Sequence, residues 1–221
     1  MHPFHSPDLK SPVLPADRAE LQCRDQTVYE APTVSLLRLL LVLALIVGPA
    51  AVARAQMPAD RMAAILARAL AYDRSLKERS GETVDIAVIW PVGDAGAAIR
   101  AHQHTAGFVS LGDLKIAGLP LRVHELPFAG VDALVPAFKM KQVDAVFLVG
   151  IGDDLMPAIL AAAAKQKAVT MGTSKAAVEA GVSLGVEAVG DKPTIFVNIQ
   201  SATREGASFA ANLLRVAVVV K

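Results

Sequence analysis

"VDAVFLVGIGDDLMPAILAAAAKQKAVTMGT", residues 143–173, decides the fold class because it alternates between two kinds of hydrophobic pattern. It opens with a short, nearly continuous apolar run, which is typical of a strand covered on both faces. Residues 153–167 predict a helix, with Asp153 or Asp154 as its N-cap and lysines near its C-terminal end. Residues 168–173 predict a second strand. A strand, a helix and a strand in succession form the unit from which parallel sheets are built.

The same alternation continues toward the N-terminal side of this unit. Strands are expected at residues 84–90, 119–126, 143–150 and 168–173, and helices at residues 60–76, 97–103, 131–142, 153–167 and 175–180. Pro136 must lie in the first turn of its helix or kink that helix. The alternation predicts a single α/β domain with a mostly parallel, doubly wound sheet.

The pattern changes toward the C-terminus. Two extended runs, residues 182–189 and 194–199, are separated by the turn-forming residues Gly-Asp-Lys-Pro. They predict an antiparallel hairpin at the edge of the sheet. Residues 201–220 place apolar side chains on one helical face, so we expect a closing helix, although the β-branched end VAVVV could fray or extend.

Residues 34–55, VSLLRLLLVLALIVGPAAVARA, are predicted to be a signal peptide. Their uncharged stretch, residues 39–53, has about fifteen residues, which suits a secretory signal, whereas a bilayer crossing needs roughly twenty. The small side chains of Ala53 and Ala55 match a signal peptidase site, so we expect cleavage after Ala55 and export to the periplasm. The alternative is an inner-membrane signal-anchor.

Residues 1–33, which precede this segment, have mixed charge and no periodicity, so they are predicted to be a disordered extension. A GTG codon at Val34 would start the chain there and make the extension an incorrectly assigned start. The folded domain is then expected over residues 57–221, a length that suits one hydrophobic core.

The charge balance and the cysteine content exclude several classes of function. The chain has 22 basic and 21 acidic residues and a net charge of +1, so nothing attracts a polyanion and nucleic acid is not expected as a partner. The single cysteine, Cys23, precedes the expected cleavage site. The exported domain would therefore have no disulfide, no thiolate nucleophile and no thiolate metal ligand.

The histidines do not predict a metal or catalytic site. His102 and His104 are two residues apart, and on a helix such neighbours point in different directions and cannot share a metal ion. His124 is interpreted as a half-exposed strand residue. No GxSxG or HExxH motif is present. We therefore expect no catalytic residue, no metal and no cofactor, and do not expect an enzyme.

Three loops follow parallel strands and should meet at the carboxyl edge of the sheet, where open α/β sheets bind ligands. One loop contains the only tryptophan, and another combines hydroxyl groups with a lysine at a helix N-terminus, where an anion could bind. The candidate ligand-binding residues are Trp90, Asp94, Asp153, Thr173, Ser174 and Lys175. The simpler interpretation of Ser174 is an ordinary N-cap, and an acidic pair such as Asp153 and Asp154 would repel phosphate.

The segment from residue 141 to residue 220 resembles the C-terminal half of the YfiR-like periplasmic proteins. The matching pieces are "DAVFLVG", "AVTMGTSKAAVEAGVSLGVEAVGDKPTIFVNI" and "SATREGASFAANLLRVAVVV". The matching positions are Gly172, Gly181, Ile195, Asn198, Ala202, Leu213, Leu214 and Ala217. Two departures suggest a divergent branch: Trp90-Pro91 follows the first strand instead of preceding it, and the exported part has no cysteine.

The resemblance implies a periplasmic regulator that forms a homodimer and binds a membrane signalling protein, such as a diguanylate cyclase in cyclic-di-GMP signalling. It implies binding and not turnover. The alternative is a solute-binding module that passes a small-molecule ligand to a transporter or receptor. Such modules enclose their ligand between two lobes, and this chain is long enough for only one.

Overall fold

The computed structural model describes residues 57–220, so the predicted extension over residues 1–33 and the predicted signal peptide over residues 34–55 lie outside the described residues. Among residues 57–220, no helix has the length and hydropathy that a membrane crossing requires.

The described residues form one open sheet of eight strands in the order β2-β3-β1-β4-β5-β6-β7-β8. The strands are β1 (Val84–Pro91), β2 (Lys115–Ile116), β3 (Leu119–Phe128), β4 (Ala145–Leu148), β5 (Val169–Gly172), β6 (Leu184–Val189), β7 (Lys192–Asn198) and β8 (Val218–Val220). Strands β3, β1, β4, β5 and β6 run parallel, β2 is antiparallel to β3, and β7 is antiparallel to β6. The predicted mostly parallel sheet is confirmed.

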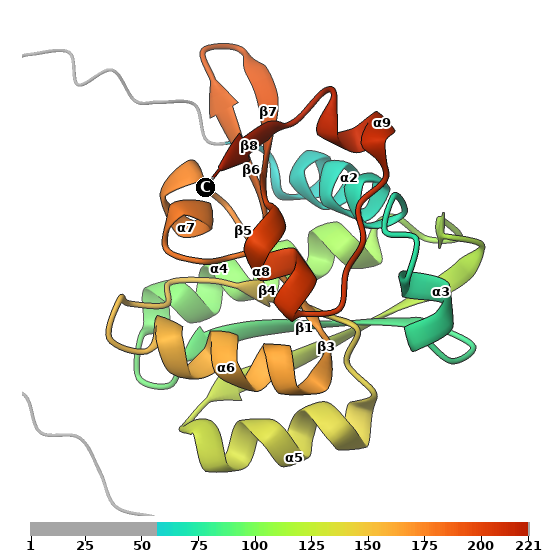
Figure 1. The fold of residues 1–221 in the computed structure, drawn as a ribbon. Coiled ribbons are helices and arrows are strands. Elements are labelled where there is room, and N and C mark those ends of the chain that lie inside the picture. Colours follow the sequence, from blue (N-terminus) through green and yellow to red (C-terminus); the bar gives the residue numbers. More distant parts are fainter. Residues whose placement is uncertain (1–56, 221) are drawn as a thin grey trace, which may run out of the picture. The chain divides into compact units, whose positions relative to one another are not determined.

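Helices cover both faces of this sheet (Figure 1). They are α2 (Ala59–Leu70), α3 (Leu76–Arg79), α4 (Ala95–Val109), α5 (Val131–Lys141), α6 (Met156–Gln166), α7 (Lys175–Glu179), α8 (Ile199–Arg204) and α9 (Ala211–Leu214). Helices α2 and α4 pack on one face, and α5 and α6 pack on the other. Because both faces are covered, every residue of β4 is buried, which explains its continuous apolar sequence.

The chain reverses its direction of travel through the sheet beside β1. Helix α4 leads from β1 outward to β3, and α5 then leads back past β1 to β4 on its other side. The carboxyl ends of β1 and β4 therefore form the topological switch point, the place where sheets of this kind bind ligands.

The predicted closing helix over residues 201–220 is wrong. The chain forms α8 and α9 there and ends in the strand β8, which pairs parallel with β7. Gly206, with φ of +77°, follows α8, and three consecutive valines favour a strand. The hairpin of β6 and β7 is antiparallel as predicted, but β8 and not β7 is the edge.

Two helix predictions also need correction, and one of the two alternatives for Pro136 is excluded. Neither Asp153 nor Asp154 caps α6, which begins at Met156 after a turn and has Pro157 in its first turn. The helix predicted over residues 60–76 is divided into α2 and α3. Pro136 lies inside α5, beyond its first turn.

Candidate functional site

The predicted ligand loops follow β1, β4 and β5, and these strands are neighbours in the sheet. Two of the predicted ligand-binding side chains are helix caps. The Asp94 carboxylate accepts a hydrogen bond from the backbone N–H of Ala97 at 2.8 Å and caps α4. The Ser174 hydroxyl accepts from the backbone N–H of Ala177 at 3.2 Å and caps α7, as predicted. Each side chain satisfies a backbone donor of its own helix.

The anion position predicted at the start of α7 is occupied by a side chain of the protein. The backbone N–H of Lys175 donates to the Glu187 carboxylate at 2.8 Å, and the Lys175 ammonium pairs with Glu179 at 2.7 Å. Thr173 lies half-buried just before this helix. The negative charge that we expected from a ligand is thus supplied by Glu187 from β6.

Trp90 and Asp153 differ in their environments. Trp90 is 8% exposed, and its ring lies against the His102 ring with a centroid separation of 5.6 Å. His102 Nδ1 in turn lies 2.8 Å from the Glu125 carboxylate. Asp153 is exposed in the turn before α6. The ligand crevice proposed for these loops stays a prediction.

Sequence reasoning missed Arg100, which reaches from α4 to the switch point. A Cβ on Gly150, in the loop after β4, would lie 3.1 Å from Arg100 Nη2, and a Cβ on Gly96 would lie 3.3 Å from Nη1. The two glycines therefore leave room for the guanidinium. No sequence motif marks Arg100, because its position depends on a loop fifty residues later in the chain.

A buried carboxylate, Asp85, lies at the amino edge of the sheet. It is 1% exposed and accepts hydrogen bonds from Arg122 Nε at 2.6 Å, from Arg122 Nη2 at 3.0 Å and from the Thr83 hydroxyl at 2.6 Å. His124 Nε2 lies 2.5 Å from the same carboxylate. Burial would raise the pKa of Asp85, but the hydrogen bonds from these three side chains together bring it below its ordinary value. The cluster ties β1 to β3.

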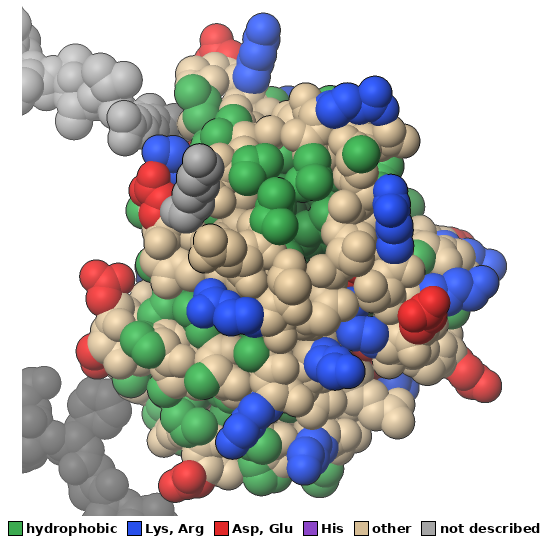
Figure 2. All heavy atoms as spheres, in the orientation of Figure 1, with side chains coloured by type: hydrophobic (Ala, Val, Ile, Leu, Met, Phe, Trp, Pro, Cys, Tyr) green, Lys and Arg blue, Asp and Glu red, His purple; other side chains and the backbone are tan. Residues whose placement is uncertain are grey.

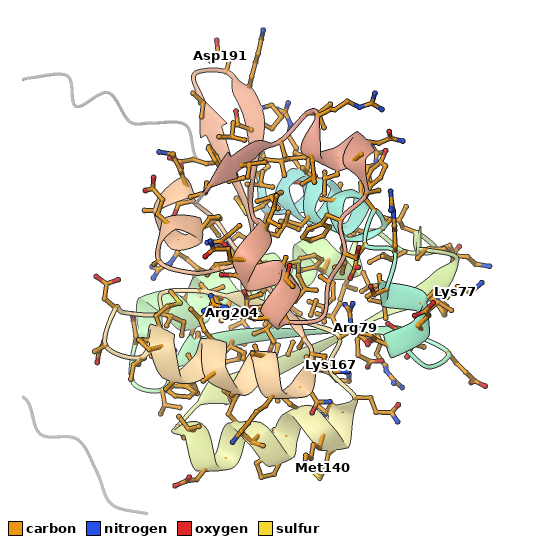
Figure 3. The ribbon with its side chains drawn as sticks, viewed as in Figure 1. Lys77, Arg79, Met140, Lys167, Asp191 and Arg204 are labelled. Atoms are coloured by element: carbon orange, nitrogen blue, oxygen red, sulfur yellow. The ribbon has the colours of Figure 1, made fainter. Side chains whose placement is uncertain are left out.

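A second buried carboxylate, Glu205, follows α8 and is 2% exposed. The Thr170 backbone N–H and hydroxyl donate to it at 2.8 and 2.7 Å, and the Ser183 hydroxyl donates to it as well. Burial outweighs these bonds and raises the pKa of Glu205 to about 7. Figure 3 shows Lys167 and Arg204 on the surface around the end of α8. The cluster anchors the C-terminal segment to β5 and β6.

The most unusual surface feature is the free edge of the sheet at β8. Val216, Val218 and Val219 are 73%, 44% and 44% exposed, and we call them the valine edge. Among the described residues, no strand pairs with the outer side of β8. Figure 2 shows hydrophobic side chains gathered in the region of β8 and α9, with Lys and Arg side chains spread around them and over the rest of the same face.

The opposite edge of the sheet is protected. Strand β2 has only two residues, and β3 carries Pro120 and Pro127, which cannot donate a hydrogen bond to an added strand. Strand β8 is also short, with three residues, but it contains no proline and its exposed side chains are apolar, and an apolar edge is typical of a surface that binds another chain.

Within residues 57–220, no group of three histidine, cysteine or acidic side chains is placed to hold a metal ion.

Comparison with known proteins gives a family and a fold. A family model described as YfiR/HmsC-like matches residues 63–218. No curated protein matches the sequence. One similar solved structure is an ABC domain in complex with L-Trp from Streptococcus pneumoniae, with 16% identity, a TM-score of 0.50, and 74% of this chain and 62% of that chain covered. Another is a conserved domain protein from Vibrio cholerae, with 15% identity, a TM-score of 0.51, and 74% of this chain and 60% of that chain covered. At these identities the likeness shows the fold alone.

Proposed function

The chain belongs to the YfiR/HmsC-like family, and on that premise we propose that it is an exported periplasmic regulator that binds and modulates a membrane-embedded signalling protein. A diguanylate cyclase is the kind of partner that we expect, which would place the chain in cyclic-di-GMP signalling. The family match over residues 63–218 supports this proposal because it extends over nearly the whole described domain.

The observation that carries the proposal is the valine edge. A partner segment in extended conformation would pair with the outer backbone groups of β8 and cover the side chains of Val218 and Val219. The contact would bury apolar surface and satisfy backbone groups in one step. A second copy of the chain, as in the expected homodimer, would compete for the same edge.

The architecture supports a binding protein with one lobe. The described residues form a single sheet, and the chain spans about 60% of the two solved structures to which it is similar. A solute-binding module that encloses its ligand between two lobes needs a second sheet domain. This alternative therefore requires a binding site on the surface of one lobe, and the open depression described in the next subsection is the observation that favours it.

Affinity capture from detergent-solubilised envelopes tests the proposal. The bait is the full chain with an epitope in the exposed turn after Gly112. We expect the wild-type chain to retain a membrane protein, and Val219→Lys to lose it because a charge cannot be buried in the contact. Met140→Lys is the matched control, since Met140 on α5 is 80% exposed and lies away from β8 (Figure 3).

Equal capture by the wild type and Val219→Lys would contradict the role of the valine edge. A monomeric chain that retains a small molecule and no membrane protein would favour the solute-binding alternative.

A further inference from the structure

An open depression of about 580 Å³ lies between the start of α2 and one side of α4. Sites for small molecules have volumes of roughly 300 to 1,000 Å³, so the space suits a compact organic ligand. Its lining includes Met57, Asp60, Arg100, Gln103, His104 and Ser110. None of them is among the ligand-binding residues predicted from the sequence.

The spacing of residues along α4 explains how the depression forms. Arg100, Gln103, Gly107 and Ser110 lie three or four residues apart and therefore share one side of the helix. A Cβ on Gly107 would lie 2.7 Å from the carbonyl carbon and oxygen of Ala59, so only glycine lets the start of α2 come this close. The close contact brings the first residues of α2 beside the polar side chains of α4.

Arg100 gives the depression a permanent positive charge. Among the described residues, no carboxylate lies within ion-pair distance of its guanidinium. The guanidinium is directed toward Gly96 and Gly150, which do not line the depression, so Arg100 lies at the end of the depression nearest the carboxyl edge of the sheet. The one acidic lining residue, Asp60, lies in the first turn of α2, where the helix dipole favours its charge.

His104 adds a neutral hydrogen-bonding group next to this cation. Burial and the charge of Arg100 both lower the pKa of His104, so its imidazole is neutral at neutral pH. The ring is fixed by an edge contact with Phe147, at a centroid separation of 4.8 Å. An anion bound at Arg100 would oppose the guanidinium charge and favour the protonated imidazole.

We propose that this depression binds a small organic anion whose carboxylate or phosphate group pairs with Arg100. Gln103 and His104 hydrogen-bond the anion, and Met57 provides apolar contact for the rest of the molecule. The proposal goes beyond the partner-binding function and does not depend on it, because none of these residues belongs to the valine edge. In a regulator, the depression would be an effector site.

The test follows the histidine side chains by NMR during titration with benzoate or inorganic phosphate, at constant ionic strength. The protein is purified after expression of the full chain. We expect saturable shifts of the His104 signals and a rise in the pKa of His104 of about half a unit or more, and no ligand-induced change in the NMR signals of His102 and His124. Arg100→Gln should weaken binding at least tenfold, about 1.4 kcal/mol, whereas Arg68→Gln, which removes the same charge from the exposed side of α2, should not change it.

A response to benzoate alone or to phosphate alone would support the site and identify which anionic group it prefers. No shift at His104 with either probe, or equal shifts in wild type and Arg100→Gln, would overturn the proposal. Neither result would affect envelope capture, in which Val219 and not Arg100 is changed.

Discussion

Glu205 should make the protein more stable as the solution becomes mildly acidic. Its carboxyl group is 2% exposed, and burial raises its pKa from the ordinary 4.5 to about 7 despite hydrogen bonds from Ser183 and Thr170. The folded state therefore binds this proton more tightly than the unfolded state. The stabilisation is absent above the folded pKa, grows as the pH falls through it, and is complete below the unfolded pKa.

The magnitude follows from the two pKa values. The difference between 4.5 and about 7 corresponds to about 3 kcal/mol, because a change of one in pKa is about 1.4 kcal/mol. Between pH 8 and pH 5, most of this free energy, about 2 to 3 kcal/mol, should be gained. Other groups titrate in the same interval, notably His104, whose lowered pKa acts in the opposite direction. A variant is therefore needed to separate the contribution of Glu205 to the pH dependence of stability from those of the other groups.

Glu205→Gln provides that comparison because an amide has nearly the shape of a carboxyl group and does not titrate. Urea unfolding of both proteins from pH 5 to pH 8 gives the free energy of unfolding at each pH. We expect the variant to lose about 2 to 3 kcal/mol relative to wild type on going from pH 8 to pH 5. Glu179→Gln is the control, because Glu179 belongs to an exposed pair. It should alter the change in unfolding free energy between pH 8 and pH 5 by less than about 0.5 kcal/mol. If the free energies of unfolding of wild type and Glu205→Gln differed by the same amount at every pH in this range, the reasoning would be refuted.

Three further predictions concern stability and are measured by urea unfolding at pH 7. Gly107→Ala should lower the free energy of unfolding by about 1 to 3 kcal/mol, because its methyl group would meet the backbone of α2. Gly81→Ala, with no neighbour closer than 4.0 Å, should lower it by less than about 0.5 kcal/mol, and equal losses would contradict the close contact. Asp94→Ala should lower the free energy of unfolding by about 1 kcal/mol through loss of the α4 cap, whereas Asp153→Ala should leave it unchanged. A larger loss for Asp153→Ala than for Asp94→Ala would contradict this assignment of the caps. Asp85→Asn should cost about 3 kcal/mol because three side chains lose their shared carboxylate. Since the folded pKa of Asp85 is lowered, this contribution is present at neutral pH and lost as the pH falls through that value, so an unchanged cost at very low pH would contradict the account.

The parts of the fold that were predictable are those in which local sequence and tertiary environment agree. Strands β1 and β4 are buried on both faces, and their continuous apolar runs are a direct consequence of that burial. The Ser174 cap was predictable for the same reason, because a capping side chain bonds a backbone group only three residues away.

The errors arose where a distant contact overrides the local pattern. Residues 218–220 continue a helical spacing of apolar residues, but the free side of β7 offers backbone partners that a helix end lacks. The acidic pair before α6 has the composition of a cap, but a turn separates it from the helix. Strand β2 has only two residues, too few to produce an alternating pattern.

The buried polar groups had no sequence signal at all. Glu205 bonds Thr170 and Ser183, which are 35 and 22 residues away in the chain. Arg100 lies at the switch point because Gly150 and Gly96 lack side chains there. Contacts of this kind can be identified only once the topology is known, because they join elements that are distant in the sequence. The sequence therefore indicated which loops meet at the carboxyl edge of the sheet but did not single out Arg100, and ligand binding at this edge stays a prediction.

Site-specific photo-crosslinking in intact cells tests the central claim most directly. A crosslinking amino acid is placed at position 219 on the valine edge or at position 140 on α5, both in the full chain. The account predicts an adduct in the membrane fraction from position 219, with the mass of the chain plus a membrane protein, and no such adduct from position 140. Equal adducts at both positions, or none at either, would contradict it.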